Sequence, residues 1–285
     1  MRKRDTQFWE SAALNNATYR QYFTRLTEIS LAIFRWENLP ETIDPRFLEL
    51  TLFKNGSAVF FEDDGGLGFL ALPCAANGPF DVYRVPINRR AYASNSYNAN
   101  LSNKNSVIIY NNYMRTNAVL DVKMFARRLY NIDRAIDVNI NAQKTPILIR
   151  CDESQRLSLE NAYQKYDGNQ MFIFGDKSLN PKLFEAVNTQ APYVADKLQE
   201  IKSQIWNEAL TYLGVANVQV NKKARLTTDE VARLQGGAIA SRFSRLQARR
   251  EACEKINAMF GLNVWCNFRT EEEPDAEESE VEMDG

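Results

Sequence analysis

Histidine is absent from this chain of 285 residues. Its absence removes the usual general base, the commonest metal ligand and the middle member of a Ser-His-Asp triad, so most hydrolase mechanisms are disfavoured. Cysteine is scarce. The four thiols of Cys74, Cys151, Cys253 and Cys266 lie far apart and form no CxxC pair, which argues against a zinc ribbon or a disulfide framework. We therefore expect reduced thiols, no bound metal and no cofactor.

Long apolar runs are lacking as well. No stretch approaches the roughly 20 apolar residues that cross a bilayer, and the basic N-terminal sequence MRKRDTQFWE leads into no hydrophobic segment. We expect neither a membrane span nor secretion. Because 45% of the residues are hydrophobic, the chain can bury one large core or two modest ones, which excludes wholesale disorder.

Phosphate-binding and catalytic motifs are missing too. The glycines Gly65, Gly66 and Gly68 are followed by no Lys-Ser or Lys-Thr pair and by no helical pattern, so they favour a β-turn over a phosphate loop. No Walker A sequence occurs, which excludes a P-loop motor. Asp63 and Asp64 lie in the same predicted turn, where bonds from backbone N–H groups explain them. We assign no catalytic residue and expect no enzyme.

The net charge of −1 conceals a strong asymmetry along the chain. Glu271 to Asp284 holds nine acids and no base, and removing those nine from the 36 acids leaves 27 against 35 bases, a balance of +8 for residues 1–270. A basic body suits a polyanionic partner, although scattered lysines and arginines on a solvated surface are the more frequent explanation. The acidic tail, residues 271–285, is expected to be disordered and either to repel DNA or to meet a basic partner.

Three apolar stripes with helical spacing predict three long helices. These cover residues 11–40, 117–143 and 191–214. Asn117 is the expected N-cap of the second helix, and the third is entered at Pro192 and closed by Gly214. The stripe residues are Tyr19, Tyr22, Leu26, Ile29, Ile33 and Trp36 in the first helix, Ala118, Val122, Phe125, Leu129, Ile132, Ile136 and Ile140 in the second, and Val194, Leu198, Ile201, Ile205, Ala209 and Tyr212 in the third. Such stripes fit either the core of a helical bundle or a ring of helices that pack between copies.

Short strand-like runs lie between the first two helices and predict a small β-barrel or sandwich over residues 56–112. The predicted strands are Ser57–Glu62 and Leu67–Leu72, which form a hairpin, followed by Asp81–Ile87 and Val107–Tyr110, with Tyr92–Asn105 as a long loop. Residues 147–188 predict a compact α+β element, in which strands at Ile147–Arg150 and Met171–Phe174 flank a helix at Leu157–Tyr166. A helix over Ile239–Phe260 and a strand over Leu262–Phe268 complete an α+β chain.

Five sequence blocks carry a family resemblance that covers most of the chain. They are WENLP at Trp36–Pro40, NINAQKTPILIR at Asn139–Arg150, APYVADKL at Ala191–Leu198, WNEALTYLG at Trp206–Gly214 and EACEKINAMFGLNV at Glu251–Val264. Together they resemble the portal protein, or upper collar and head-to-tail connector, of small podophages with protein-primed linear DNA. The resemblance implies a ring-forming portal fold. Its three helices would form a tilted central stem, residues 56–112 an SH3-like barrel at the narrow end, and residues 147–188 with 241–270 a mixed α/β wide end.

The resemblance also implies a function without catalysis. A homododecameric ring at one capsid vertex of the virion, made in the host cytoplasm, would pass, hold and release double-stranded DNA. Its partners would be copies of itself, the packaging ATPase, capsid and scaffold proteins and the lower collar or tail protein. In such a ring, each copy contacts the next through two different surfaces. The copies form a closed ring because the rotation between neighbours adds up to a full turn.

Basic residues near the third helix are the candidate DNA contacts that the resemblance supplies. Residues 215–240 would form a loop that projects into the channel, with Lys222, Lys223 and Arg225 on it, and Lys197 would add a further level of charge. The family has another channel lysine where this chain has Asn188, so that level should be missing here. Lysines that face phosphates carry no sequence information, which suits a conduit for a whole genome.

The N-terminal arm, residues 1–10, contains Arg2, Lys3 and Arg4. Such a basic terminus is usually frayed and solubilising, whereas the resemblance implies contact with a packaging RNA. Two other functions remain open on the sequence alone. A nucleic-acid-binding regulator would use the basic body and the β-rich domain, and a nuclease with carboxylate-bound metal would need acids that converge at strand ends.

Overall fold

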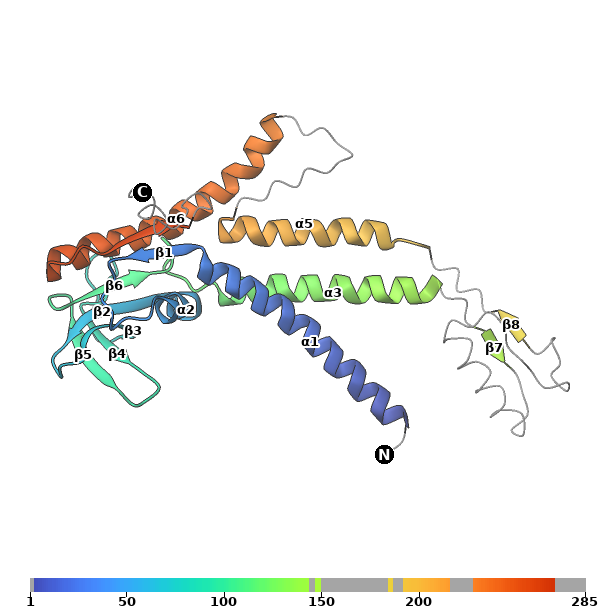
Figure 1. Ribbon diagram of the computed structural model, residues 1–285, viewed down its shortest axis with the longest axis horizontal. Helices are drawn as coiled ribbons and strands as arrows, with labels where there is room; N and C mark the ends of the chain where they lie inside the picture. Colours follow the sequence, from blue (N-terminus) through green and yellow to red (C-terminus); the bar gives the residue numbers. More distant parts are fainter. Residues whose placement is uncertain (1–2, 144–146, 150–183, 187–191, 216–227, 270–285) are drawn as a thin grey trace, which may run out of the picture. The chain divides into compact units, whose positions relative to one another are not determined.

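The computed structural model describes residues 3–143, 147–149, 184–186, 192–215 and 228–269 (Figure 1). The chain divides into two compact units. Residues 1–130 and 203–285 form the larger unit, and residues 131–202 form the smaller. Helices and strands both occur, so the α+β class is confirmed.

The larger unit contains an antiparallel sheet of five strands in the order β5-β4-β3-β2-β6. Its strands are β2 (Ser57–Asp63), β3 (Gly68–Ala76), β4 (Asn88–Tyr92), β5 (Asn98–Ser102) and β6 (Ser106–Tyr110). The β2–β3 hairpin confirms its prediction, with Asp63 opposite Gly68 and the Asp63 carboxylate accepting the backbone N–H of Leu67 at 3.1 Å. β2 is buried on both faces: Val59 and Phe61 pack with Ala91, and the Phe60 ring meets the Phe260 ring at 5.5 Å.

Two predictions inside the β-rich segment are wrong. Residues 81–87 form a turn instead of a strand, because the Asp81 carboxylate accepts the backbone N–H groups of Tyr83 and Val85 and folds the chain back. The strand follows at β4. Residues 98–102 of the predicted loop form β5, which pairs with β4 through its backbone. Its sequence NANLS lacks the apolar alternation that announces a strand.

The first helix is displaced from its prediction at both ends. Helix α1 runs from Lys3 to Ala32, so residues 3–10 are not an arm ahead of it. Beyond its end, Phe34–Glu37 form strand β1, which pairs with β9 (Trp265–Phe268) so that Trp36 lies opposite Cys266. The spacing of Ile33 and Trp36 predicted a helix here, but residues 34–37 instead pair with a strand that is distant in sequence. Local periodicity does not reveal such a tertiary contact.

Helix α2 (Pro45–Asn55) was missed, although its boundary signals are present in the sequence. Asp44 is the N-cap and accepts the backbone N–H of Arg46 at 2.8 Å. Proline occupies the first helical position, and Gly56 closes the helix with its N–H bonded to the carbonyl of Leu52. These are the usual start and stop residues of a helix.

Helices α3 (Val119–Gln143) and α5 (Ala195–Leu213) match the second and third predicted helices closely. Within the larger unit their stripes are buried, with Val122, Leu129, Ile205 and Ala209 at most 4% exposed. The ring of Phe125 packs on that of Tyr212 at 5.7 Å between centroids. The apolar stripes therefore pack here as the helical spacing predicts.

Helix α6 (Thr228–Phe260) corrects two predictions. The predicted channel loop over residues 215–240 is wrong for residues 228–240, because Gly236 and Gly237 continue the helix. A Cβ at residue 237 would lie 3.2 Å from Cγ2 of Thr211, so glycine lets α6 approach α5 closely. In addition, α6 packs against β6 and β9 (Figure 1). Residues 241–270 therefore belong to the larger unit together with the β-rich domain. The prediction that they join residues 147–188 in one wide end is wrong.

The smaller unit contains the ends of α3 and α5 that lie in residues 131–202, together with a short antiparallel pair of strands. β7 (Ile147–Ile149) pairs with β8 (Phe184–Ala186), with Leu148 opposite Glu185. The strand predicted at Ile147–Arg150 is thus confirmed for residues 147–149. The predicted strand Met171–Phe174, the predicted helix Leu157–Tyr166 and the acidic tail lie outside the described residues.

Candidate functional site

The predicted DNA contacts fall mostly outside the described residues. Lys222, Lys223 and Arg225 lie in residues 216–227, and Arg2 precedes α1. Lys3 and Arg4 begin α1. Lys197 is described: it lies in the first turn of α5 and is exposed. The structure therefore brings none of these residues together. Lys197 is the one predicted contact whose side-chain surroundings it describes.

The start of α5, which positions Lys197, is fixed by Asn139 of α3. The Asn139 amide donates to the carbonyl of Pro192 at 2.9 Å, and its oxygen accepts the backbone N–H of Val194 at 3.0 Å. Both contacts lie within the smaller unit. An asparagine from another helix thus serves one of the backbone donors that a helix start leaves free. In the sequence, Asn139 stands out only as the first residue of the block NINAQKTPILIR, and no local pattern indicates this capping role.

Charges of both signs surround Lys197. Asp196 precedes it and accepts the hydroxyl of Tyr193 at 3.3 Å, and the Asp196 charge is the main cause that raises the pKa of Tyr193. Nearby on the same pair of helices, Lys202 and Asp133 form an ion pair at 2.7 Å. Among the described residues Lys197 makes no ion pair, so its ammonium is available to an external anion.

The C-terminal end of α5 is held by arginines and a serine of α6. Arg242 Nε donates to the carbonyl of Gly214 at 3.2 Å, and Arg245 donates to the carbonyl of Tyr212 at 3.3 Å. The hydroxyl of Ser241 donates to the same Tyr212 carbonyl. Cationic donors at a helix C-terminus satisfy its free carbonyls and oppose its dipole. The point from which residues 216–227 leave α5 is therefore fixed.

Gly214 and Tyr212 complete this junction. Gly214 has φ of 86°, and a Cβ there would lie 3.0 Å from the backbone of Arg242, so only glycine fits without strain. The Tyr212 hydroxyl donates to Asp121 of α3 at 2.6 Å. Burial and this hydrogen bond raise the pKa of Tyr212 to about 12. The junction thus joins α3, α5 and α6 at one place.

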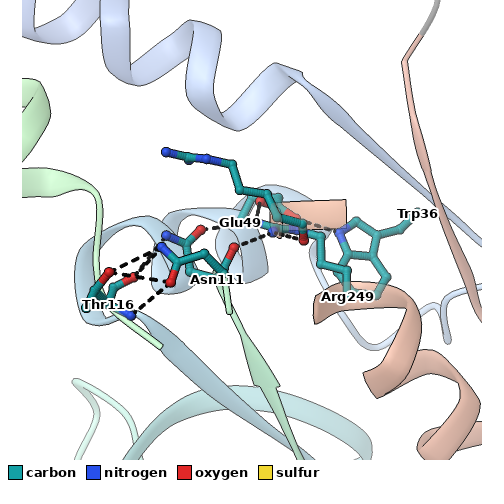
Figure 2. Close-up of polar contacts among 7 residues, drawn as sticks. Trp36, Glu49, Asn111, Thr116 and Arg249 are labelled. Carbon is teal, nitrogen blue, oxygen red and sulfur yellow. Dashed lines mark hydrogen bonds and ion pairs between the residues drawn. The ribbon is translucent and has the colours of Figure 1, made fainter. Parts of the chain in front are cut away.

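A buried ion pair lies deeper in the larger unit (Figure 2). Arg249 of α6 donates through Nε and Nη2 to the two oxygens of Glu49 of α2 at 2.8 and 2.7 Å. The indole N–H of Trp36 donates to the same carboxylate at 2.9 Å, and Arg249 Nη1 donates to the carbonyl of Asn111 at 2.9 Å. Although burial opposes the charged guanidinium, the Glu49 carboxylate outweighs it and raises the pKa of Arg249.

Several arginines of the basic body thus serve inside the fold. The guanidinium of Arg242 lies 3.7 Å from the ring centroid of Phe268, that of Arg245 lies 4.9 Å from Tyr212, and that of Arg249 lies 4.0 Å from Phe34. Arg245 and Arg249 are only 4% and 1% exposed. In the sequence, these arginines are three and four residues apart within the predicted helix Ile239–Phe260. This spacing could have predicted that they share one face of the helix. Because buried cations meet no external phosphate, these arginines do not support a nucleic-acid-binding regulator.

The remaining chemistry of the described residues is sparse. They contain no group of three His, Cys, Asp or Glu side chains that could hold a metal ion. Cys74, Cys253 and Cys266 are free thiols, and burial raises the pKa of Cys253 to about 12. In the part of the chain that the structure describes, no helix is long and apolar enough to cross a membrane.

The chain is similar to known phage proteins. A family model described as Phage Connector (GP10) matches residues 9–272. A chain from the solved portal and tail of native bacteriophage P68 superposes with a TM-score of 0.52 at 14% identity, covering 95% of this chain and 92% of that chain. An HK97 family phage portal protein from Corynebacterium diphtheriae gives a TM-score of 0.43 at 10% identity, covering 88% of this chain and 94% of that chain.

Proposed function

Because this chain belongs to the phage connector family, the portal proteins of the virion vertex where head and tail meet, we propose that it acts as a closed ring of about a dozen copies around a DNA channel. The ring passes the genome during packaging, retains it and releases it on infection. It docks the packaging ATPase, which supplies the force, and contacts capsid, scaffold and tail proteins. Its role is structural, and no residue is assigned to catalysis.

Large apolar side chains that are exposed on the long helices carry this proposal. In the larger unit, Leu120 and Met124 stand one turn apart on α3 and are 66% and 50% exposed, and Ile239 and Phe243 repeat this spacing on α6 at 59% and 57%. In the smaller unit, Val138 is 67% and Ile201 41% exposed. Rows of exposed apolar side chains on helices are typical of surfaces that another chain covers. Neighbouring copies of a ring would cover them.

A ring would also bring the same basic residues of all copies to one level of the channel. One exposed Lys197 per copy becomes a level of positive charge in a ring, and Lys222, Lys223 and Arg225 would add charge in the segment that follows the anchored end of α5. Contacts with phosphates hold DNA electrostatically and without regard to its sequence. The SH3-like barrel remains part of this proposal, supported by β6 returning beside β2. Contact of Arg2, Lys3 and Arg4 with RNA remains a prediction.

Alanine substitution of the lysine pair tests the proposed role in DNA retention. We expect Lys222→Ala with Lys223→Ala to leave ring assembly intact and to reduce the fraction of packaged heads that keep their DNA. The matched control is Lys54→Ala with Lys123→Ala, two exposed lysines of α2 and α3. Loss of the ring in the Lys222 and Lys223 variant, or equal loss of DNA in the control, would contradict the assignment.

A further inference from the structure

A cavity of about 400 Å³ lies in the larger unit, where α6 faces the edge strand β6 and the loops beside it. The polar side chains that line it include Arg89, Ser106, Tyr110, Arg115, Glu251 and Lys255. Three of these side chains are cations and one is an acid. The cavity therefore carries a positive balance, and the helix that forms one wall, α6, leads towards β9 and the end of the chain.

Arg89 is the unusual member of this group. Its side chain is only 4% exposed, and Nη1 and Nη2 donate to the carbonyls of Ser106 and Pro86, both at 3.0 Å. Its Nε is buried and has no hydrogen-bond partner among the described residues. No carboxylate of the described residues pairs with it, and burial lowers the pKa of Arg89.

The contrast with Arg249 shows what Arg89 lacks. Both guanidiniums are buried, but Arg249 has the two oxygens of Glu49 at 2.8 and 2.7 Å, whereas Arg89 has only neutral carbonyls. A buried cation without an anion is strongly destabilising. An anion that enters the cavity would lower this cost, so the cavity is suited to a carboxylate or another anion.

Two further cations flank Arg89 in the cavity. Arg115 donates to the carbonyls of Tyr83 and Arg84 at 3.3 and 3.2 Å, and its guanidinium lies 4.7 Å from the ring centroid of Tyr110. These contacts fix Arg115 at the cavity wall, where it forms no ion pair with an acid of the described residues. Lys255 is exposed on α6, one turn beyond Glu251.

We propose that this cavity holds carboxylates of the chain's own acidic tail, which docks in the same copy from which it extends. The tail is the complementary segment: Glu271 to Asp284 contains nine acids and no base. This inference goes beyond the ring and the DNA channel and does not depend on them. It assigns a specific docking partner to the cavity and a role to the tail.

The geometry of the chain end permits this docking. Strand β9 lies against α6, since Arg250 donates to the carbonyl of Cys266 at 3.2 Å and to the side chain of Asn267 at 2.8 Å. The cavity lies along the same helix, which is about 10–12 Å across with its side chains. Residues 270–285 can span about 50 Å when extended. The tail is therefore several times longer than the path around α6 requires.

Attachment to the same chain makes weak charge pairs sufficient. A short linker holds the tail at an effective concentration on the order of 1 mM, so individually weak charge pairs can together populate the docked state. These pairs are screened by salt, because the Debye length falls from about 10 Å at 0.1 M to about 3 Å at 1 M. Docking should therefore be frequent at low salt and rare at high salt.

Carbodiimide crosslinking of the full-length protein tests the proposal, because it joins a carboxylate to a lysine amine without a spacer. The product is digested and analysed by mass spectrometry for peptides that link residues 270–285 to Lys255. Lys54 and Lys123 are the controls, since both are likewise exposed lysines on helices of the larger unit. An equal mixture of isotopically labelled and unlabelled protein distinguishes links within a copy from links between copies.

We expect tail links to Lys255 to exceed those to either control lysine severalfold, because all three lysines belong to the chain that carries the tail and only Lys255 lines the cavity. They should join residues of one copy and fall severalfold in 1 M salt. Glu251→Gln removes the cavity's acid and should increase the yield at Lys255 alone. Equal yields at the three lysines, links only between copies, or no response to Glu251→Gln would overturn the proposal.

Discussion

The two units of the chain differ in how much of their own surface they bury. The larger unit holds a continuous core, in which Leu48, Leu52, Phe60 and Ile109 are completely buried. In the smaller unit, among residues 131–140 and 192–202, whose burial is described, only Ala195 is buried. Since burial of apolar surface is the main stabilising term in folding, the larger unit can stabilise itself, whereas the described part of the smaller unit leaves apolar side chains that other copies would cover in the proposed ring.

The ion pairs of the two units repeat this difference. The side chains of Arg249 and Glu49 in the larger unit are 1% and 4% exposed, while those of Lys202 and Asp133 in the smaller unit are 28% and 18% exposed. Water reaches the second pair and screens it. The two pairs therefore provide a direct way to compare the units by mutation.

Removal of Glu49 should have the largest effect. Glu49→Ala leaves the Arg249 guanidinium buried without an anion, which is expected to lower the free energy of unfolding by about 3–5 kcal/mol. Asp133→Ala in the smaller unit should lower it by about 1 kcal/mol or less. Urea unfolding followed by circular dichroism measures both values under the same conditions. Equal effects of the two substitutions would remove the distinction between the units.

An acidic substitution on the exposed apolar surface of the smaller unit should reduce ring assembly and leave folding unchanged. Ile201 is 41% exposed, and Ile201→Asp would place a charge against a neighbouring copy at a cost of about 1–3 kcal/mol per interface. We expect fewer rings in analytical ultracentrifugation and an unchanged far-ultraviolet spectrum. Gln199→Asp, at an exposed polar position of the smaller unit on the opposite side of the same helix, is the control and should assemble normally.

Alkaline pH should weaken the larger unit specifically. Burial raises the pKa of Cys253 from its ordinary value of 9.0 to about 12. The unfolded thiol therefore loses its proton above about pH 9 while the folded thiol keeps it, so the stability contribution is complete below pH 9 and is lost as pH rises towards 12. Each such thiol should lower the free energy of unfolding by about 1.4 kcal/mol per pH unit in this range.

The quantity to compare is the slope of the free energy of unfolding against pH, not the free energy of unfolding at one pH. Cys253→Ala should make the dependence shallower between pH 9 and pH 11 in urea unfolding experiments. Tyr193 of the smaller unit is exposed, and the Asp196 charge raises its pKa, so Tyr193→Phe should leave the slope almost unchanged because solvent screens the pair. A slope that Cys253→Ala leaves unaltered would show that another group dominates.

The smallest expected effect concerns Lys197. Lys197→Gln removes one positive charge per copy at an exposed position, and each phosphate contact that is lost should reduce the slope of log affinity against log salt by about 0.9. Binding of duplex DNA to assembled rings over a salt series measures this slope. Lys123→Gln on α3 is the control, and an equal change in that variant would show that net charge alone is responsible.

The sequence predicted the parts of the fold that local patterns determine. Helices α3 and α5 were located to within four residues at each end, because continuous apolar stripes and a boundary residue such as Gly214 act within a few turns. Helix α2 was also predictable from Asp44, Pro45 and Gly56, but these signals were overlooked. By contrast, β5 was missed because its polar residues pair through the backbone, which leaves no periodic signal.

The candidate site depends on contacts that no local pattern announces. Glu49 and Arg249 are 200 residues apart, and Asn139 reaches Val194 across 55 residues. The strand at Trp36 forms only because a partner strand near the C-terminus is present. The family resemblance supplied Lys197, Lys222 and Lys223 as candidate DNA contacts, yet it gave no indication that arginines of α6 would be buried inside the fold.

Native mass spectrometry of the purified full-length chain, paired with negative-stain imaging, tests most directly whether neighbouring copies cover the exposed apolar surface. Mass gives the number of copies, and the images show whether they close around a hole. We expect a ring of about a dozen copies with a central opening. A monomer or dimer at micromolar concentration, with the smaller unit nonetheless stably folded, would contradict it.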